Sequence, residues 1–199
     1  MYINGLHVDR VPTNPDPEYQ TYESIDLTPY LRTGANTIAA LVYNAGEGLH
    51  HRMNARGGFF FQARIIDQKG KIIKLNSDKN WSVAQAVAWD TKTKHRQNDH
   101  TIGMRERYDA RLAHEGWEQS SFDHSNWKKA KEIGIPPLEP WNQNVVIKRE
   151  RLFYELIKPV RSWSTNGYKV YDFGKAITAF PRFTVNASKS GLAMSLGTG

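Results

Sequence analysis

The apolar residues of this sequence recur with a period of two rather than 3.6, which is the spacing of β-strands. Residues 59–66 alternate so that one face is strongly apolar and the other is mixed. The apolar face holds Phe59, Phe61, Ala63 and Ile65. No segment of twelve or more residues shows an amphipathic helical stripe, so the chain is predicted to be all-β.

Turn residues separate these short apolar segments. Asp67–Gly70 predicts a hairpin loop before Ile72, and Asn166-Gly167 predicts a turn before a strand at Tyr168–Phe173. The run Ile38–Tyr43 has the length of a buried strand. Short strands that recur every roughly 8–12 residues, separated by such turns, predict a β-sandwich or jelly roll.

Composition and charge exclude several classes of protein. The 199 residues hold 12% aromatic residues, too many for a disordered chain. No run approaches the ~18 apolar residues of a membrane span, no signal peptide is evident at the N-terminus, and the absence of cysteine excludes disulfides. The net charge of +7 arises after residue 90, where cations are interspersed with acids. We therefore expect no nucleic-acid partner and no membrane span.

Prolines mark the expected domain boundary. Residues 136–144 begin with Pro136-Pro137 and include Pro140, a composition that disfavours a central strand and makes a stiff linker. We expect a first domain over residues 1–135 and part of a second β-sandwich over residues 145–199.

Three segments together resemble a known family. They are Tyr2-Ile3-Asn4-Gly5 with residues 22–39, residues 102–130 with Tyr108-Asp109-Ala110-Arg111 and Gly116-Trp117, and residues 170–174 with Gly191–Gly197. The first is typical of galactose-binding-like jelly rolls. The second is similar to the N-terminal region of bacterial α-L-rhamnosidases of glycoside hydrolase family 78, and the third resembles the start of the next β-sandwich of those enzymes. The chain departs from the family pattern at His124, often Asp in the family, and at Phe180, often a small residue.

The resemblance implies a non-catalytic β-sandwich fragment that braces or shapes an active site. In this family a downstream (α/α)6 barrel supplies the acidic residues for inverting hydrolysis, and that barrel is expected beyond this sequence. The implied partners are this catalytic domain and, through the parent enzyme, a rhamnose-containing glycan. A periplasmic or extracellular location is also implied, although a cytoplasmic one stays open.

The nearest carboxylate pair is Glu106 and Asp109, but residues three apart in a strand face opposite ways. Arg105 and Arg111 flank the pair and would hold both groups ionised, which is wrong for a general acid. We expect these four residues to form a structural ion cluster in an ion-rich strand. Accordingly, no catalytic, cofactor-binding or metal-binding residue is predicted.

Tryptophans are the remaining candidates, because indole faces stack on sugar rings. Trp81, Trp117 and Trp127 lie inside the resembling segments, where packing in the core is the first expectation and contact with carbohydrate or a neighbouring domain the second. His50-His51 lacks a spaced third ligand, which disfavours a metal site there.

Two other functions stay open from the sequence. The chain could be a stand-alone carbohydrate-binding module without hydrolase activity, which saturable sugar binding would reveal. It could also be a scaffolding β domain without a ligand, which the absence of a following hydrolase domain would reveal.

Overall fold

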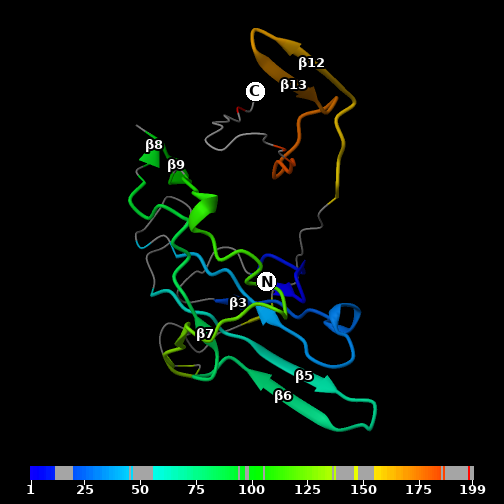
Figure 1. Cartoon of the computed structure of the whole chain (residues 1–199), viewed down its shortest axis with the longest axis vertical. Helices are drawn as coiled ribbons and strands as arrows, with labels where there is room; N and C mark the ends of the chain where they lie inside the picture. The colour runs from blue at the N-terminus through cyan, green and yellow to red at the C-terminus, as the bar shows by residue number, and fades with distance from the viewer. Residues whose placement is uncertain are drawn as a thin grey trace. The chain divides into compact units, whose positions relative to one another are not determined.

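The computed structural model is built from short strands and two 3₁₀ turns, with no α-helix among the residues it describes. Those residues are 1–11, 20–44, 46, 56–93, 95–96, 99–104, 106–135, 137, 146–147, 155–184, 186 and 197. The all-β class predicted from the period-two pattern is confirmed (Figure 1).

The elements follow one another along the chain at short intervals. The strands are β1 (Tyr2–Ile3), β2 (Leu6–His7), β3 (Thr21–Tyr22), β4 (Ile38–Ala39), β5 (Gln62–Ile66), β6 (Ile72–Asn76), β7 (Ser82–Val83), β8 (His95–Arg96), β9 (Asp99–Met104), β10 (Lys128–Lys129), β11 (Val146–Ile147), β12 (Arg161–Thr165) and β13 (Tyr168–Asp172). The 3₁₀ turns are η1 (Thr28–Tyr30) and η2 (Ala110–Leu112).

Most of these strands pair in twos. The described strands form one three-stranded sheet, in the order β2-β1-β4, and five two-stranded sheets. All pairings are antiparallel except that of β3 with β11, which is parallel and joins residues about 125 positions apart.

Contacts divide the chain into two compact units, Met1–Arg151 and Leu152–Gly199. The second unit therefore begins later than the predicted second domain, because β11 pairs with β3 of the first unit. Of the predicted linker, residues 136–144, only Pro137 lies within the described residues. The predicted boundaries at 135 and 145 stay predictions.

The first unit has its most deeply buried side chain in the β2-β1-β4 sheet. Ile3 is 0% exposed, and it pairs with Leu6 on one side and Ile38 on the other. The turn between β1 and β2 is Asn4-Gly5, with φ values of 51° and 84°. Both values are positive, as the two central residues of a type I′ hairpin turn require. A side chain at Gly5 would also overlap that of Gln119.

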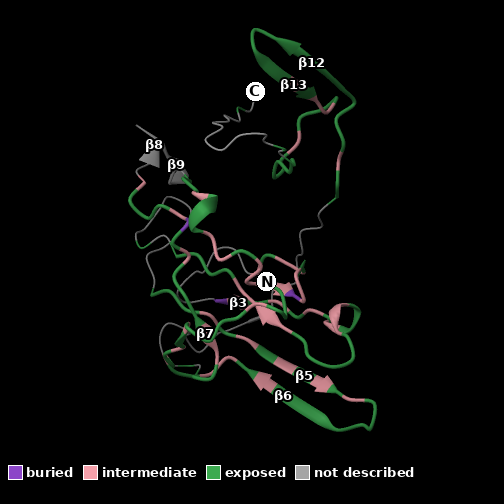
Figure 2. Cartoon of the chain, in the orientation of Figure 1, coloured by how far each residue is buried: buried purple, intermediate pink, exposed green. Residues whose placement is uncertain are grey.

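The β5–β6 hairpin has the predicted turn and the predicted faces. Ile66 pairs with Ile72 across the loop, and Gly70 has a φ of 77°. Of the alternating residues 59–66, the apolar set is half-buried and the intervening set is exposed, as Figure 2 shows along β5.

The strand predicted over Ile38–Tyr43 is wrong beyond its first two residues. Only Ile38 and Ala39 form a ladder, and Leu41, Val42 and Tyr43 are exposed. The register explains this difference, because Ala39 already pairs with Tyr2 and no described strand continues the ladder past it.

The second unit contains one described hairpin, β12–β13, whose turn is the predicted Asn166-Gly167. Both turn residues again have positive φ, 48° and 80°. All of β12 and most of β13 are exposed (Figure 2).

Candidate functional site

Trp81 belongs to an aromatic cluster at the open end of the β5–β6 hairpin. Its ring centroid lies 5.6 Å from those of Phe59 and Phe61. The indole Nε1–H donates to the carbonyl oxygen of Asn76 at 2.9 Å, so the polar edge of the ring is satisfied within the protein. The backbone carbonyl of Trp81 accepts from the amide of Ala130 at 2.8 Å. These contacts use Trp81 to join the hairpin to the segment that follows β10.

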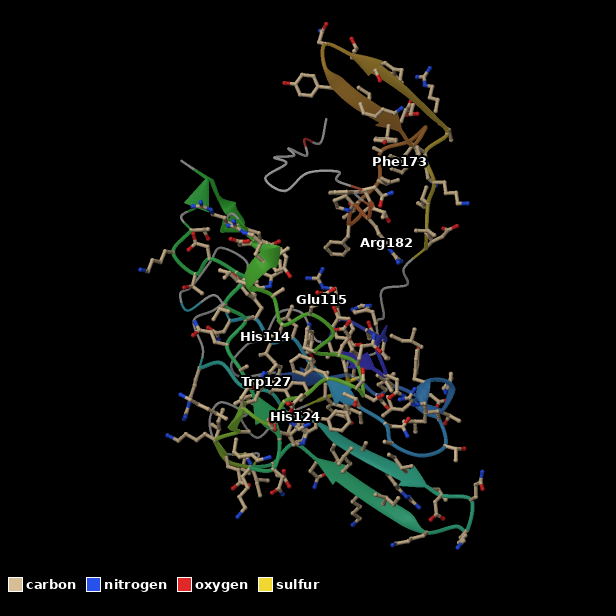
Figure 3. All side chains as sticks on the ribbon, viewed as in Figure 1. His114, Glu115, His124, Trp127, Phe173 and Arg182 are labelled. Atoms are coloured by element: carbon tan, nitrogen blue, oxygen red, sulfur yellow. The ribbon has the colours of Figure 1, made fainter. Side chains whose placement is uncertain are left out.

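Trp127 is held between two other rings of the first unit. The His114 ring lies 5.3 Å from it and the Phe122 ring 5.4 Å, both in edge-to-face geometry. The amide of Trp127 donates to the carbonyl oxygen of His124 at 3.0 Å, and these residues lie together in Figure 3. A ring nitrogen of His114 lies 3.4 Å from the carbonyl oxygen of Gln85.

Trp117 connects the loop after η2 to the first sheet. Its ring meets that of Tyr2, on β1, at 5.2 Å and an angle of 75°. Its amide donates to the carbonyl oxygen of His114 at 3.2 Å. Each predicted tryptophan is thus half-buried and in contact with another ring, and contact with carbohydrate or a neighbouring domain stays a prediction for all three.

Asp109 caps a 3₁₀ turn instead of lying in the expected ion-rich strand. Its Oδ1 accepts from the amide of Arg111 at 3.1 Å and from Arg111 Nε at 2.8 Å, while Oδ2 accepts from the second guanidinium nitrogen at 2.6 Å. These bonds lower the pKa of Asp109 to about 2. The pair lies at the surface, with the Arg111 side chain 87% exposed.

An isolated β-bridge fixes the backbone that precedes this pair. Tyr108 forms an antiparallel bridge with Trp89, and their ring centroids are 4.8 Å apart. The amide of Asp109 donates to the carbonyl oxygen of Ala88 at 2.8 Å, and Ala88 is buried. Asp109 therefore joins the turn that contains buried Ala88 to an exposed 3₁₀ turn.

Glu106 does not join this arrangement. It is exposed, and within the described part of the chain it makes no hydrogen bond or ion pair. Arg105 lies outside the described residues. Of the four residues predicted to form an ion cluster, the structure brings together Asp109 and Arg111, and the structural role of the cluster stays a prediction.

Two histidine positions were singled out in the sequence for different reasons. His50-His51 lies outside the described residues. His124, which departs from the family pattern, has Nδ1 3.1 Å from the hydroxyl oxygen of Ser82 on β7. Its neighbour Asp123 accepts from the amide of Ser125 at 2.9 Å, which lowers the Asp123 pKa.

Sequence reasoning missed a pair of asparagines that ties three segments together. Asn4 Nδ2 donates to the carbonyl oxygen of Tyr30 at 3.0 Å and to Asn36 Oδ1 at 2.8 Å. Asn4 Oδ1 accepts from the amide of Thr37 at 2.9 Å. Asn36 in turn accepts from the amide of Arg32 and donates to its carbonyl oxygen. We call Asn4 and Asn36 the asparagine clamp; the sequence shows each of them only as an Asn close to a turn glycine, Gly5 and Gly34.

Neither a metal centre nor a membrane helix emerges from the described ranges. No three His, Asp or Glu side chains gather there as ligands for a metal ion. No helix in that part of the chain has the length and apolar character needed to cross a bilayer.

Two comparisons identify relatives of this arrangement. The family model described as the alpha-L-rhamnosidase N-terminal domain matches residues 1–161. The crystal structure of a GH78 family rhamnosidase of Bacillus sp. GL1 is similar, with 25% sequence identity and a TM-score of 0.59. That similarity covers 82% of this chain and 17% of the rhamnosidase chain. Comparison with curated proteins finds no match.

These findings agree with the motifs on which the resemblance was based. The family match includes the asparagine clamp, the Asp109 turn and all three predicted tryptophans. The all-β structure, compatible with a β-sandwich, is that expected of such a region. This chain therefore belongs to the alpha-L-rhamnosidase N-terminal domain family.

Proposed function

We propose that this chain is the non-catalytic β-sandwich portion of an α-L-rhamnosidase, which braces or shapes an active site built by a downstream (α/α)6 domain. The observation that carries the proposal is the family match over residues 1–161, in a chain that spans 17% of the similar rhamnosidase. The longer enzyme would hydrolyse terminal α-L-rhamnosides of a rhamnose-containing glycan.

The chemistry of the described carboxylates supports a non-catalytic role. Glycoside hydrolysis requires a carboxylic acid that keeps its proton near neutral pH, so its pKa must be raised. The pKa of Asp109 is lowered instead by Arg111, and hydrogen bonds from turn amides or neighbouring side chains lower the pKa values of Asp26, Asp123 and Asp172. These four carboxylates are suited to capping turns.

The tryptophan contacts support a bracing role rather than a catalytic one. Trp81 and Trp117 join segments distant in sequence, and Trp127 fixes its own loop by packing on the rings of His114 and Phe122. A domain whose largest side chains fix its own loops presents a preorganised surface to a neighbour, which is what support of an active site requires.

The experiment compares three purified proteins on an aryl α-L-rhamnoside: the 199-residue chain, the longer enzyme, and the longer enzyme lacking residues 1–161. We expect no turnover by the chain alone, turnover by the longer enzyme, and a reduced kcat/KM after the deletion. A melting curve of the deletion variant separates lost support from general unfolding.

Two results would contradict the proposal. Turnover by the chain alone that persists through rigorous purification and in the Glu106→Gln variant would make the chain itself an enzyme. A deletion variant that stays folded and keeps an unchanged kcat/KM would show that residues 1–161 do not brace the active site.

A further inference from the structure

The outer face of the β5–β6 hairpin is a cationic surface that the proposed function does not use. Side chains alternate along each strand, so every second residue of the two paired strands points to the same face. That face consists of Gln62, Arg64, Ile66, Ile72, Lys74 and Asn76, all exposed. We call these six residues the outer face.

Two like charges lie directly opposite each other on the outer face. Arg64 pairs with Lys74 in the antiparallel register. Directly opposite side chains in such a ladder have Cβ atoms about 4.5–5.5 Å apart, and like charges in these positions are destabilising. Among the described residues, no acidic side chain forms an ion pair with either cation. An external anion lying between them would relieve the repulsion.

The turn of the hairpin adds two cations and does not neutralise them. Asp67 is the acid of this segment, and its Oδ1 accepts from the amides of Lys69 and Lys71, at 2.8 Å each. Its carboxylate is thus held against the turn backbone. The side chains of Lys69 and Lys71 are exposed at this end of the hairpin, whose turn lies at the edge of the first unit (Figure 1).

Apolar surface adjoins the charged pair. Ile66 and Ile72 pair across the ladder next to Arg64 and Lys74 and are 60% and 47% exposed. A polymer with both carboxylates and apolar ring faces matches this combination, as a polyuronate does. The outer face contains no aromatic side chain, which disfavours single-stranded nucleic acid because its binding relies on base stacking.

We propose that the outer face binds an anionic, carboxylate-bearing polysaccharide. Carboxylates lie between Arg64 and Lys74, and ring faces pack on Ile66 and Ile72. The inference rests on the proposed function only in taking a glycan as the polyanion. The outer face lies in the proposed non-catalytic portion of the enzyme, and there it would hold a charged polymer close to the catalytic domain.

The test measures binding of the 199-residue chain to polygalacturonate by isothermal titration calorimetry at low and at high salt. The key variant is Arg64→Gln/Lys74→Gln. The matched control is Lys128→Gln/Lys131→Gln, which removes the same charge from two other exposed lysines. Methyl-esterified polygalacturonate serves as the uncharged ligand.

We expect saturable binding that weakens as salt rises, because exposed charges are screened. Arg64→Gln/Lys74→Gln should raise Kd at least about tenfold, the equivalent of about 1.4 kcal/mol. The control variant should stay within about twofold of the unmodified chain, and the esterified polymer should not bind. Without ligand, the key variant should melt no lower than the unmodified chain, because it loses a like-charge contact.

Three results would overturn the proposal. They are no binding of polygalacturonate at low salt, equal weakening by both double variants, and stronger binding to vesicles containing phosphatidylglycerol that depends on the same two residues. Hydrolysis of a neutral aryl α-L-rhamnoside by the longer enzyme carrying Arg64→Gln/Lys74→Gln should be unchanged. The proposed function can therefore fail or stand independently of this binding.

Discussion

Replacing Asn4 by glycine isolates the energy of the asparagine clamp. Glycine tolerates the positive φ of this position, so the Asn-Gly turn can keep its shape. The substitution removes three side-chain hydrogen bonds, to Tyr30, Asn36 and Thr37. It leaves the backbone bond from the Asn4 amide to the Thr37 carbonyl, at 3.0 Å, in place.

The expected loss follows from the number and setting of these bonds. An intramolecular hydrogen bond contributes about 1 kcal/mol net. Two of the three are half-buried and the bond to Asn36 is exposed, so Asn4→Gly should lower the free energy of unfolding by about 2–3 kcal/mol. For a chain of this size that is a fall of roughly 5–10 °C in Tm.

Asn166→Gly is the matched control for this change. Asn166 has the same backbone conformation, φ 48°, and is also followed by a glycine. Its side chain makes no hydrogen bond within the described residues, so the same substitution should cost less than about 1 kcal/mol, through the greater freedom of the unfolded chain.

Urea unfolding followed by circular dichroism gives both values. A double-mutant cycle with Asn36→Ala should yield a coupling energy of about 1 kcal/mol, because the two side chains share one bond. If Asn4→Gly destabilises the chain no more than Asn166→Gly does, the clamp does not hold the three segments together.

Three further outcomes are expected. Ile3→Ala should lower the free energy of unfolding by about 2–5 kcal/mol and Ile3→Val by about 0.5–1.5, measured by urea unfolding, because Ile3 is fully buried; similar costs for both would contradict its place in the core. Asp109→Asn should lower Tm at pH 5 and progressively less as pH falls toward 2. The pKa of Asp109 is depressed to about 2 in the folded chain, so its contribution is full above the unfolded value of about 3.9 and disappears below the folded one; a difference in Tm that does not change with pH would refute this. Hydrogen exchange in a dilute monomer should be faster in Tyr168–Asp172 than in Gln62–Ile66, because β12 and most of β13 are exposed whereas Ala63 and Ile65 of β5 are half-buried; equal protection would show that the second unit is complete.

Local features of the fold could be predicted from the sequence. Hairpin turns depend on glycine and asparagine at positions of positive φ, and the alternation of residues 59–66 determines which face packs inward. Both signals lie within a few neighbouring residues, and both hairpins, β5–β6 and β12–β13, have the predicted turns.

Features that depend on distant partners could not be predicted in this way. Leu41, Val42 and Tyr43 have the composition of a strand, but a strand needs a neighbour to pair with. Asn4 and Asn36 read separately as turn residues, and their contact exists only after β1 and β4 pair.

At the candidate site, too, one feature was predicted correctly from the sequence and another was not. The arginine beside Asp109 indicated an ionised carboxylate, and the structure agrees in the direction of the pKa shift. The backbone geometry was mistaken, because Asp109 ends an extended segment and begins a 3₁₀ turn. Aspartate favours such N-cap positions, a local preference that the strand interpretation overlooked.

The parallel pairing of β3 with β11 has a consequence for how this protein is made. Thr21 and Tyr22 leave the ribosome long before their partners Val146 and Ile147, so the two strands can meet only when synthesis of the first unit is almost finished. Closing so long a loop costs more conformational entropy than closing a hairpin, and non-local pairing of this kind is therefore slower. The β5–β6 hairpin can form while the chain is still growing, whereas β3 must wait with its edge exposed. A chain whose synthesis stopped before Val146 would thus lack the partner of β3, and the first unit would miss this closing contact.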